Sequence, residues 1–154
     1  MLGGFRAATA GVLLAAGLVF QPLAAMAEVL QTQMGVNGMT EADVVKAQVS
    51  GNVLTVAITF RNTSDKAARL QGGPGEFYFV DAAGKNKYLV LRDSAKRWLA
   101  GPLTAYNNSR FDVSIPAKGR ALIWLKFPAP PADSPTINLT TPFTLPFDNL
   151  KVRR

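Results

Sequence analysis

A run of alternating side chains sets the strongest limit on how this chain can fold. In residues 53–60 (VLTVAITF), every even position carries a large apolar side chain, and the odd positions are mostly small or polar. Successive side chains of a β-strand point to opposite faces, so this period of two predicts a strand with one buried face. Turn-forming residues bound it on both sides, in residues 50–52 and 62–65.

The rest of the chain repeats short apolar runs separated by Gly, Pro, Asn and Asp. We expect further strands at residues 44–50, 77–80, 87–92, 110–115, 120–127 and 136–140, and residues 66–70 and 149–152 could form two more short ones. No stretch after residue 27 carries an apolar stripe of helical period and length. The pattern therefore predicts an all-β protein, an immunoglobulin-like antiparallel β-sandwich of about seven or eight strands.

Two details of this sandwich follow from particular residues. Trp124 lies in the middle of the predicted strand 120–127, where a large aromatic side chain is expected to anchor the core between two sheets. Residues 128–135 are rich in proline, which lacks the backbone donor that a sheet requires. We expect this segment to form a rigid crossover between two strands.

The N-terminal 27 residues have the three regions of an export signal. Arg6 precedes an apolar run over residues 7–20, and small residues at 25 and 27 form a cleavage site between Ala27 and Glu28. The run is shorter than the ~20 residues that span a bilayer. We predict a cleaved, helical signal peptide at 1–27, a loose leader at 28–43 and the sandwich at 44–152, in the periplasm or outside the cell. An uncleaved N-terminal anchor is the alternative. A short edge strand near Val29 is an alternative for part of the leader.

Composition excludes several kinds of chemistry. The chain has no cysteine and no histidine, so thiol catalysis, an imidazole base and a zinc site with Cys or His ligands are ruled out. The aspartates are scattered, and Asp81, Asp133 and Asp148 fall in turns, where Asp bonds to nearby backbone amides. We expect no enzyme activity, no cofactor, no metal site and, after cleavage, no transmembrane segment.

Several stretches resemble bacterial extracytoplasmic immunoglobulin-like modules, which occur alone behind a signal peptide or beside OmpA-like domains. The resemblance covers roughly residues 44–152 and rests on FVD at 79–81, YLVLRD at 88–93, PAKG at 116–119 and, most specifically, FPAPPAD at 127–133. No OmpA-like domain follows in this sequence, and the resemblance carries no catalytic residues. A weaker resemblance, to immunoglobulin-like proteinase inhibitors of the BsuPI type, rests on the Asn-Thr-Ser strand end and the Pro-x-x-Gly turn.

The basic residues suggest where such a module would bind. Without Arg6, the 17 Lys and Arg residues become 16 against 10 acidic residues, a net charge of +6. The candidate binding residues are Lys85, Lys87, Arg92, Lys96, Arg97 and Trp98, in which Trp98 would offer a stacking surface beside the cations. A solvated charged surface beside a core tryptophan is the plainer alternative.

These observations predict a non-catalytic binding or structural module of the bacterial cell envelope. Its partner would be an envelope protein or an anionic envelope polymer, with the loop at 93–108 or a sheet edge as the contact, and nucleic acid is not expected in that compartment. A secreted proteinase inhibitor is the alternative function.

Overall fold

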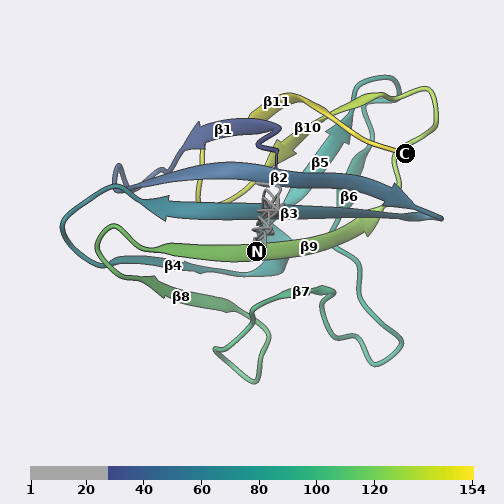
Figure 1. Cartoon of the computed structure of the whole chain (residues 1–154). Helices are drawn as coiled ribbons and strands as arrows, with labels where there is room; N and C mark the ends of the chain where they lie inside the picture. Colours follow the sequence, from purple (N-terminus) through teal and green to yellow (C-terminus); the bar gives the residue numbers. More distant parts are fainter. Residues whose placement is uncertain (1–27) are drawn as a thin grey trace, which may run out of the picture.

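The computed structural model describes residues 28–154 (Figure 1). The predicted signal peptide, 1–27, lies outside the described residues. Within them the chain forms eleven strands and one 3-10 turn, Pro74–Glu76, and no α-helix. No helix in this part of the chain is long and apolar enough to cross a membrane. The all-β class expected from the sequence is confirmed, with more strands than the seven or eight predicted.

Five strands build the larger sheet, which is antiparallel throughout. They are, in spatial order, β1 (Gln31–Met34), β2 (Thr40–Ser50), β3 (Val53–Asn62), β9 (Arg120–Pro128) and β7 (Ala100–Gly101). In β3 the even residues from Leu54 to Phe60 are fully buried, as the alternation predicts. The ladder between β3 and β9 runs without a break from Val53–Pro128 to Arg61–Arg120.

The other strands form two smaller antiparallel sheets. One has the order β11 (Phe147–Lys151), β10 (Thr136–Thr140), β5 (Tyr78–Asp81) and β6 (Lys87–Leu89), and the other pairs β4 (Ala68–Gly72) with β8 (Phe111–Ile115). β10 coincides with the strand predicted at 136–140. In Figure 1, β5, β6, β10 and β11 lie behind the large sheet toward the top of the view, and β4 and β8 lie below it.

Buried phenylalanines join the sheets. The rings of Phe60 on β3, Phe77, Phe111 on β8 and Phe143 form one cluster, in which the centroids of Phe77 and Phe143 lie 5.4 Å apart in an edge-to-face arrangement. Aromatic pairs favour such geometry over face-to-face contact. Because these residues come from distant parts of the chain, the cluster ties the large sheet and the β4–β8 sheet to the segments that precede β5 and follow β10.

Trp124 does not lie in that core. On β9 the inward residues are Ile123, Leu125 and Phe127, all fully buried, whereas Trp124 points outward and is 38% exposed. The prediction that Trp124 anchors the core between the sheets is therefore wrong. The cause is register: Ile123 is paired with the inward Ile58, which leaves Trp124 opposite the outward Ala57.

The structure also differs from the predicted leader at 28–43. Its residues form β1, which pairs with β2, and β2 begins at Thr40 rather than at residue 44. The side chains of Gln31 and Gln33 on β1 donate to the carbonyls of Asp148 and Pro146, at 3.2 and 2.9 Å. Polar residues can therefore form this strand, because its amides and side chains bond to neighbours on both sides.

The strand predicted at 87–92 changes sheets part-way. Lys87–Leu89 pairs with β5, whereas the amide of Leu91 donates to the carbonyl of Lys126 on β9, at 2.8 Å. Lys126 in turn donates to Leu99, and Leu99 donates to Leu91. The segment between Leu91 and Leu99 is thus held as a loop beside the edge of the large sheet. That loop contains four of the six candidate binding residues.

Candidate functional site

The structure separates the predicted basic residues into two groups. Lys85 and Lys87 lie on the hairpin between β5 and β6, where the ammonium of Lys87 sits 3.9 Å from the centre of the Tyr78 ring. The other four, Arg92, Lys96, Arg97 and Trp98, lie in the 91–99 loop. In Figure 1 the hairpin is near the top of the molecule and the loops next to β7 are at the bottom. One continuous patch of all six residues does not form.

An internal turn shapes the 91–99 loop. The carboxylate of Asp93 accepts hydrogen bonds from the backbone N–H and from Nε of Arg97, at 2.9 and 2.8 Å. The backbone N–H of Arg97, and then its guanidinium, hold the pKa of the Asp93 carboxyl below its usual range. Lys96 takes a left-handed conformation at φ 61° and donates its amide to the carbonyl of Asp93. The turn therefore presents Lys96 outward and partly neutralises Arg97.

Trp98 is the centre of the site. The guanidinium carbon of Arg92 lies 3.7 Å from the centre of the Trp98 ring, a cation–π contact, and the two residues form an isolated β-bridge. Gly75 packs at the edge of the indole, where an added Cβ would lie 3.5 Å from it. Trp98 is half-buried, with one part stacked and another facing solvent.

A second loop completes the surroundings of Trp98. In residues 102–110, Tyr106, Asn107 and Asn108 are all left-handed, with φ between 52° and 59°. Asn adopts this conformation readily, whereas Tyr does so seldom. The hydroxyl of Ser109 donates to the carbonyl of Tyr106 at 2.6 Å, which closes the loop. As a result the two asparagines line the same hollow as the 91–99 loop.

Two hollows open on either side of Trp98. The basic hollow, about 510 Å³, is lined by Arg92, Lys96, Arg97, Trp98, Asn107, Asn108 and Ser109. The tryptophan hollow, about 450 Å³, is lined by Asp93, Arg97, Trp98, Ala100, Gly101, Pro102, Leu103, Asn108 and Trp124. A third depression, about 410 Å³, lies beside the 3-10 turn and is lined by Glu76, Trp98 and Arg110 among others.

The charge around Trp98 is positive. The charged residues that line these depressions are the cations Arg92, Lys96, Arg97 and Arg110 and the carboxylates Asp93 and Glu76. Arg97 pairs with Asp93, and Arg110 lies 3.9 Å from Glu76. Among residues 28–154, neither Arg92 nor Lys96 forms an ion pair, so two positive charges remain for an anionic ligand.

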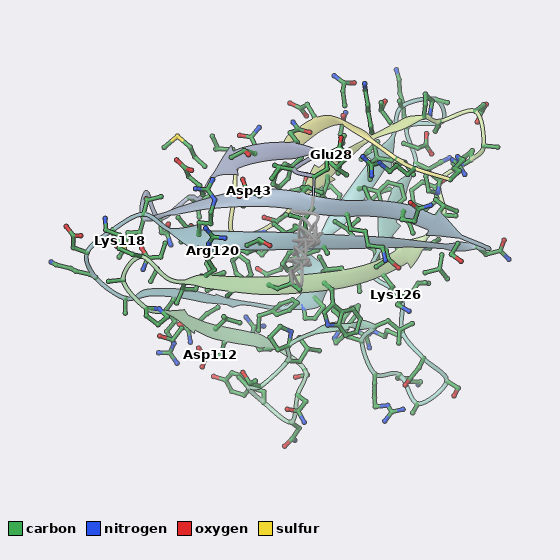
Figure 2. The ribbon with its side chains drawn as sticks, in the orientation of Figure 1. Glu28, Asp43, Asp112, Lys118, Arg120 and Lys126 are labelled. Carbon is green, nitrogen blue, oxygen red and sulfur yellow. The ribbon has the colours of Figure 1, made fainter. Side chains whose placement is uncertain are left out.

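Several carboxylates of the described residues are held in ion pairs with arginine. Asp43 and Glu41 both pair with Arg61, at 2.6 and 2.8 Å, and Asp112 pairs with Arg69 at 2.6 Å. Figure 2 shows Asp43 on β2 and Asp112 on β8, on different strands of the structure. No group of three potential metal-ligating side chains gathers in this part of the chain.

Asp81 has the turn role that the sequence predicts, whereas Asp148, also predicted in a turn, lies within β11. It is fully buried, and its Oδ1 accepts a hydrogen bond from the backbone N–H of Gly84. Through this bond the carboxylate stabilises the hairpin that carries Lys85 and Lys87. The residue is therefore a structural element of the β5–β6 connection.

Several residues of the site were not identified from the sequence. Trp124, Arg110 and Asn108 reach Trp98 only because β9 and the second loop converge there. Apolar residues stand at both odd and even positions of 120–127, so no sequence signal shows which face is buried.

Comparison with known proteins adds no assignment to this geometry. The chain matches no family model, and no curated protein or solved structure shows significant similarity to it. The function must therefore be inferred from the residues themselves.

Proposed function

We propose that this chain is an exported, non-catalytic binding module of the bacterial cell envelope, and that the surface around Trp98 binds an anionic envelope polymer. The export pattern at 1–27 and the resemblance to extracytoplasmic immunoglobulin-like modules support the location. One observation supports an anionic ligand. Arg92 and Lys96, which form no ion pair within residues 28–154, line the same hollow as Trp98.

The physical basis is electrostatic. A carboxylate or phosphate in the basic hollow would lie beside two cations whose charge the described residues leave uncompensated. Charge-assisted hydrogen bonds are stronger than neutral ones, and Arg offers a planar array of donors. Because the hollow is open to water, salt screens these interactions, with a Debye length of about 8 Å at 0.15 M.

Paired charge variants test the proposal. Binding of an anionic polymer is measured by titration calorimetry at about 50 mM and about 300 mM salt, across which screening changes strongly. Arg92→Gln/Lys96→Gln is expected to lose at least about tenfold in affinity. Lys85→Gln/Lys87→Gln removes the same charge at the β5–β6 hairpin and is the matched control. Equal losses in the two variants would show that only net charge matters and would contradict a site at Trp98.

The location has a separate test. N-terminal sequencing of the protein recovered from an envelope fraction is expected to begin at Glu28. A chain that retains its first residues would establish the N-terminal anchor in place of cleavage.

One feature favours the alternative, a proteinase inhibitor. Tyr106 is 77% exposed in the closed loop 102–110, a position from which a side chain could enter a protease pocket. Titration against serine and cysteine proteases decides this point. Absence of inhibition would remove the alternative, whereas inhibition unchanged in Tyr106→Ala would show that Tyr106 is not the residue that enters the protease.

A further inference from the structure

The basic hollow and the tryptophan hollow have three lining residues in common, Arg97, Trp98 and Asn108. A ligand that fills one hollow therefore reaches the wall of the other. The two hollows differ in chemistry, because the first carries unpaired cations and the second carries two indoles. A ligand suited to both would present an anionic group on one side and an apolar surface on the other.

We propose that this ligand is an acidic glycan, with one pyranose ring in the tryptophan hollow and its acidic group in the basic hollow. The inference rests on the proposed function, since it names the class of anionic polymer. It commits to a sugar ring because the hollow combines indole surface with polar groups at its rim, Asp93, Arg97 and Asn108.

The shape of a sugar matches this combination. A pyranose ring carries C–H bonds on its faces and hydroxyl groups around its edge. The C–H face packs against an indole through dispersion and burial of apolar area. The hydroxyls need both donors and acceptors, which Arg97 and Asn108 supply as donors and Asp93 and Asn108 as acceptors.

Trp124 is held in a position suited to this contact. Its indole lies against Gly101, where an added Cβ would be only 2.8 Å from Nε1. Glycine at residue 101 thus permits the indole to lie close to β7, while 38% of Trp124 remains exposed. Leu122, two residues earlier on the same face of β9, is also exposed but does not line the hollow.

The site is less suited to an acidic peptide. Peptides commonly bind by adding a strand to a free sheet edge, where their backbone forms a ladder. The edge beside the hollow is β7, which has only two residues, and Pro102 follows it without a backbone N–H. A peptide would find few ladder partners here, whereas a sugar needs none.

Four probes test the inference by calorimetry on the intact exported protein. They are a hexuronate oligosaccharide, an uncharged glucan of similar length, polyphosphate and an acidic peptide containing one tyrosine. We expect the hexuronate to bind about tenfold more tightly than polyphosphate of equal charge and the uncharged glucan to bind weakly. Preference for the peptide, or equal binding of all the polyanions, would overturn the inference.

Variants on β9 and β7 locate the sugar. Trp124→Ala is expected to lose at least about tenfold in hexuronate affinity and to keep its polyphosphate affinity. Leu122→Ala, a matched substitution on the same exposed face, should keep both. Gly101→Ala displaces the indole without removing it, so it should weaken hexuronate binding and shift the tryptophan fluorescence.

The outcomes separate the two proposals. If polyphosphate and hexuronate bind alike and Trp124→Ala changes neither, the sugar inference fails while the anionic-polymer function stands. If no anion binds, or if Arg92→Gln/Lys96→Gln has no effect, the proposed function fails together with the inference. Circular dichroism of each variant confirms that a loss of binding is not a loss of fold.

Discussion

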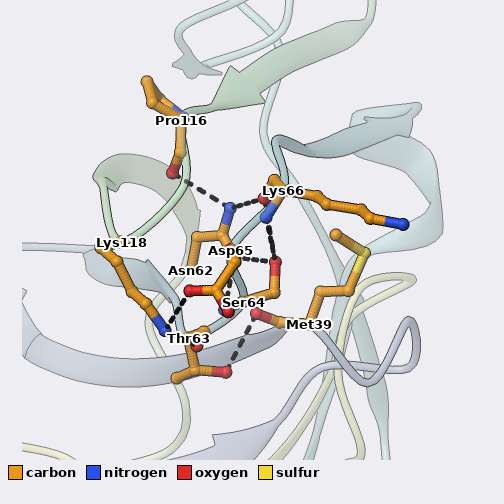
Figure 3. Close-up of polar contacts among 8 residues, drawn as sticks. All are labelled: Met39, Asn62, Thr63, Ser64, Asp65, Lys66, Pro116 and Lys118. Carbon is orange, nitrogen blue, oxygen red and sulfur yellow. Dashed lines mark hydrogen bonds and ion pairs between the residues drawn. The ribbon is translucent and has the colours of Figure 1, made fainter.

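Asn62 offers a sharp test of how this fold is held together. It ends β3, is 3% exposed, and its amide nitrogen lies within hydrogen-bond distance of the carbonyls of Lys66, Ile115 and Pro116, at 2.7, 3.0 and 3.0 Å. Its carbonyl oxygen accepts from the backbone N–H and the hydroxyl of Ser64, at 3.0 and 2.8 Å (Figure 3). One side chain thus connects the ends of β3 and β8 to the turn that leads into β4.

The contribution of Asn62 to the free energy of unfolding depends on which groups lose a hydrogen-bond partner when its side chain is removed. In Asn62→Ala the groups of Ser64 and Lys66 regain water, because both residues lie near the surface. The carbonyl of Ile115 loses a donor at a buried site, whereas the carbonyl of Pro116, an exposed residue, keeps the amide of Gly119 at 2.8 Å. At about 1–3 kcal/mol for one unsatisfied buried group, the expected loss is about 2 kcal/mol. For a domain of this size that corresponds to a fall in Tm of roughly 5–10 °C.

Urea unfolding followed by circular dichroism measures this loss. Asn138→Ala is the matched control, since Asn138 is exposed and its side chain accepts one hydrogen bond, from the amide of Asn149 at 2.9 Å. We expect the control to lose less than about 1 kcal/mol. Similar losses at the two positions would refute the argument, because they would show that burial of the network adds nothing.

A conservative variant sharpens the same test. Asn62→Asp keeps the acceptor oxygen for Ser64 but places a carboxyl group against the carbonyls of Ile115 and Pro116. The ionised form is disfavoured there, so the pKa of the introduced acid is raised in the folded state. The loss of stability in Asn62→Asp is therefore small below the unfolded pKa of ~4 and grows as the pH rises above that value. A penalty that does not change between pH 3 and pH 7 would contradict this reasoning.

Three further predictions concern other parts of the core and the edge. Arg61 donates to Asp43 and holds the pKa of that carboxyl below its usual range, so this stabilisation is complete above the unfolded pKa and is lost as the pH falls through the folded pKa. Arg61→Met should therefore lower the free energy of unfolding by roughly 1–3 kcal/mol at pH 7. In urea unfolding, its difference from the wild type should become smaller toward pH 2, and a difference that does not change with pH would refute this. Phe143 packs edge-on against Phe60 and Phe77. Phe143→Ala should lower the free energy of unfolding by about 3–5 kcal/mol in the same assay. A loss below about 1 kcal/mol would mean that the aromatic cluster does not contribute to stability. Deleting residues 28–36 uncovers the edge of β2, so size-exclusion chromatography should show larger species than for the intact chain; an unchanged elution volume would show that β1 does not protect that edge.

Local patterns predicted the strands well where one face is apolar and the other is not. β3 and β10 fall where the alternation placed them, because burial on alternate sides is imposed residue by residue along an extended chain. β1 was missed for the opposite reason. Its QTQM sequence has no apolar face, and its place comes from backbone pairing with β2 and from glutamine bonds to the segment before β11.

The candidate site was predicted only in part. Arg92, Lys96, Arg97 and Trp98 are neighbours in sequence, so a single loop keeps them together. Lys85 and Lys87 are almost as close in sequence, but the chain changes sheets between Leu89 and Leu91 and separates them from the others. The chain changes sheets where the edge of another strand has unpaired backbone groups with which it can form hydrogen bonds, and no single residue encodes that choice.

The sequence by itself determined the all-β class, the positions of the clearest strands, the exclusion of thiol and imidazole chemistry, and the loop that carries Trp98. The tertiary structure alone decided which face of β9 is buried, because that strand is apolar on both sides and only its register with β3 distinguishes them. That choice turns Trp124 outward, beside Gly101 and opposite Trp98 across one hollow. The pairing of two tryptophans with unpaired cations is thus a property of strand register, which arises from contacts between residues far apart in the chain.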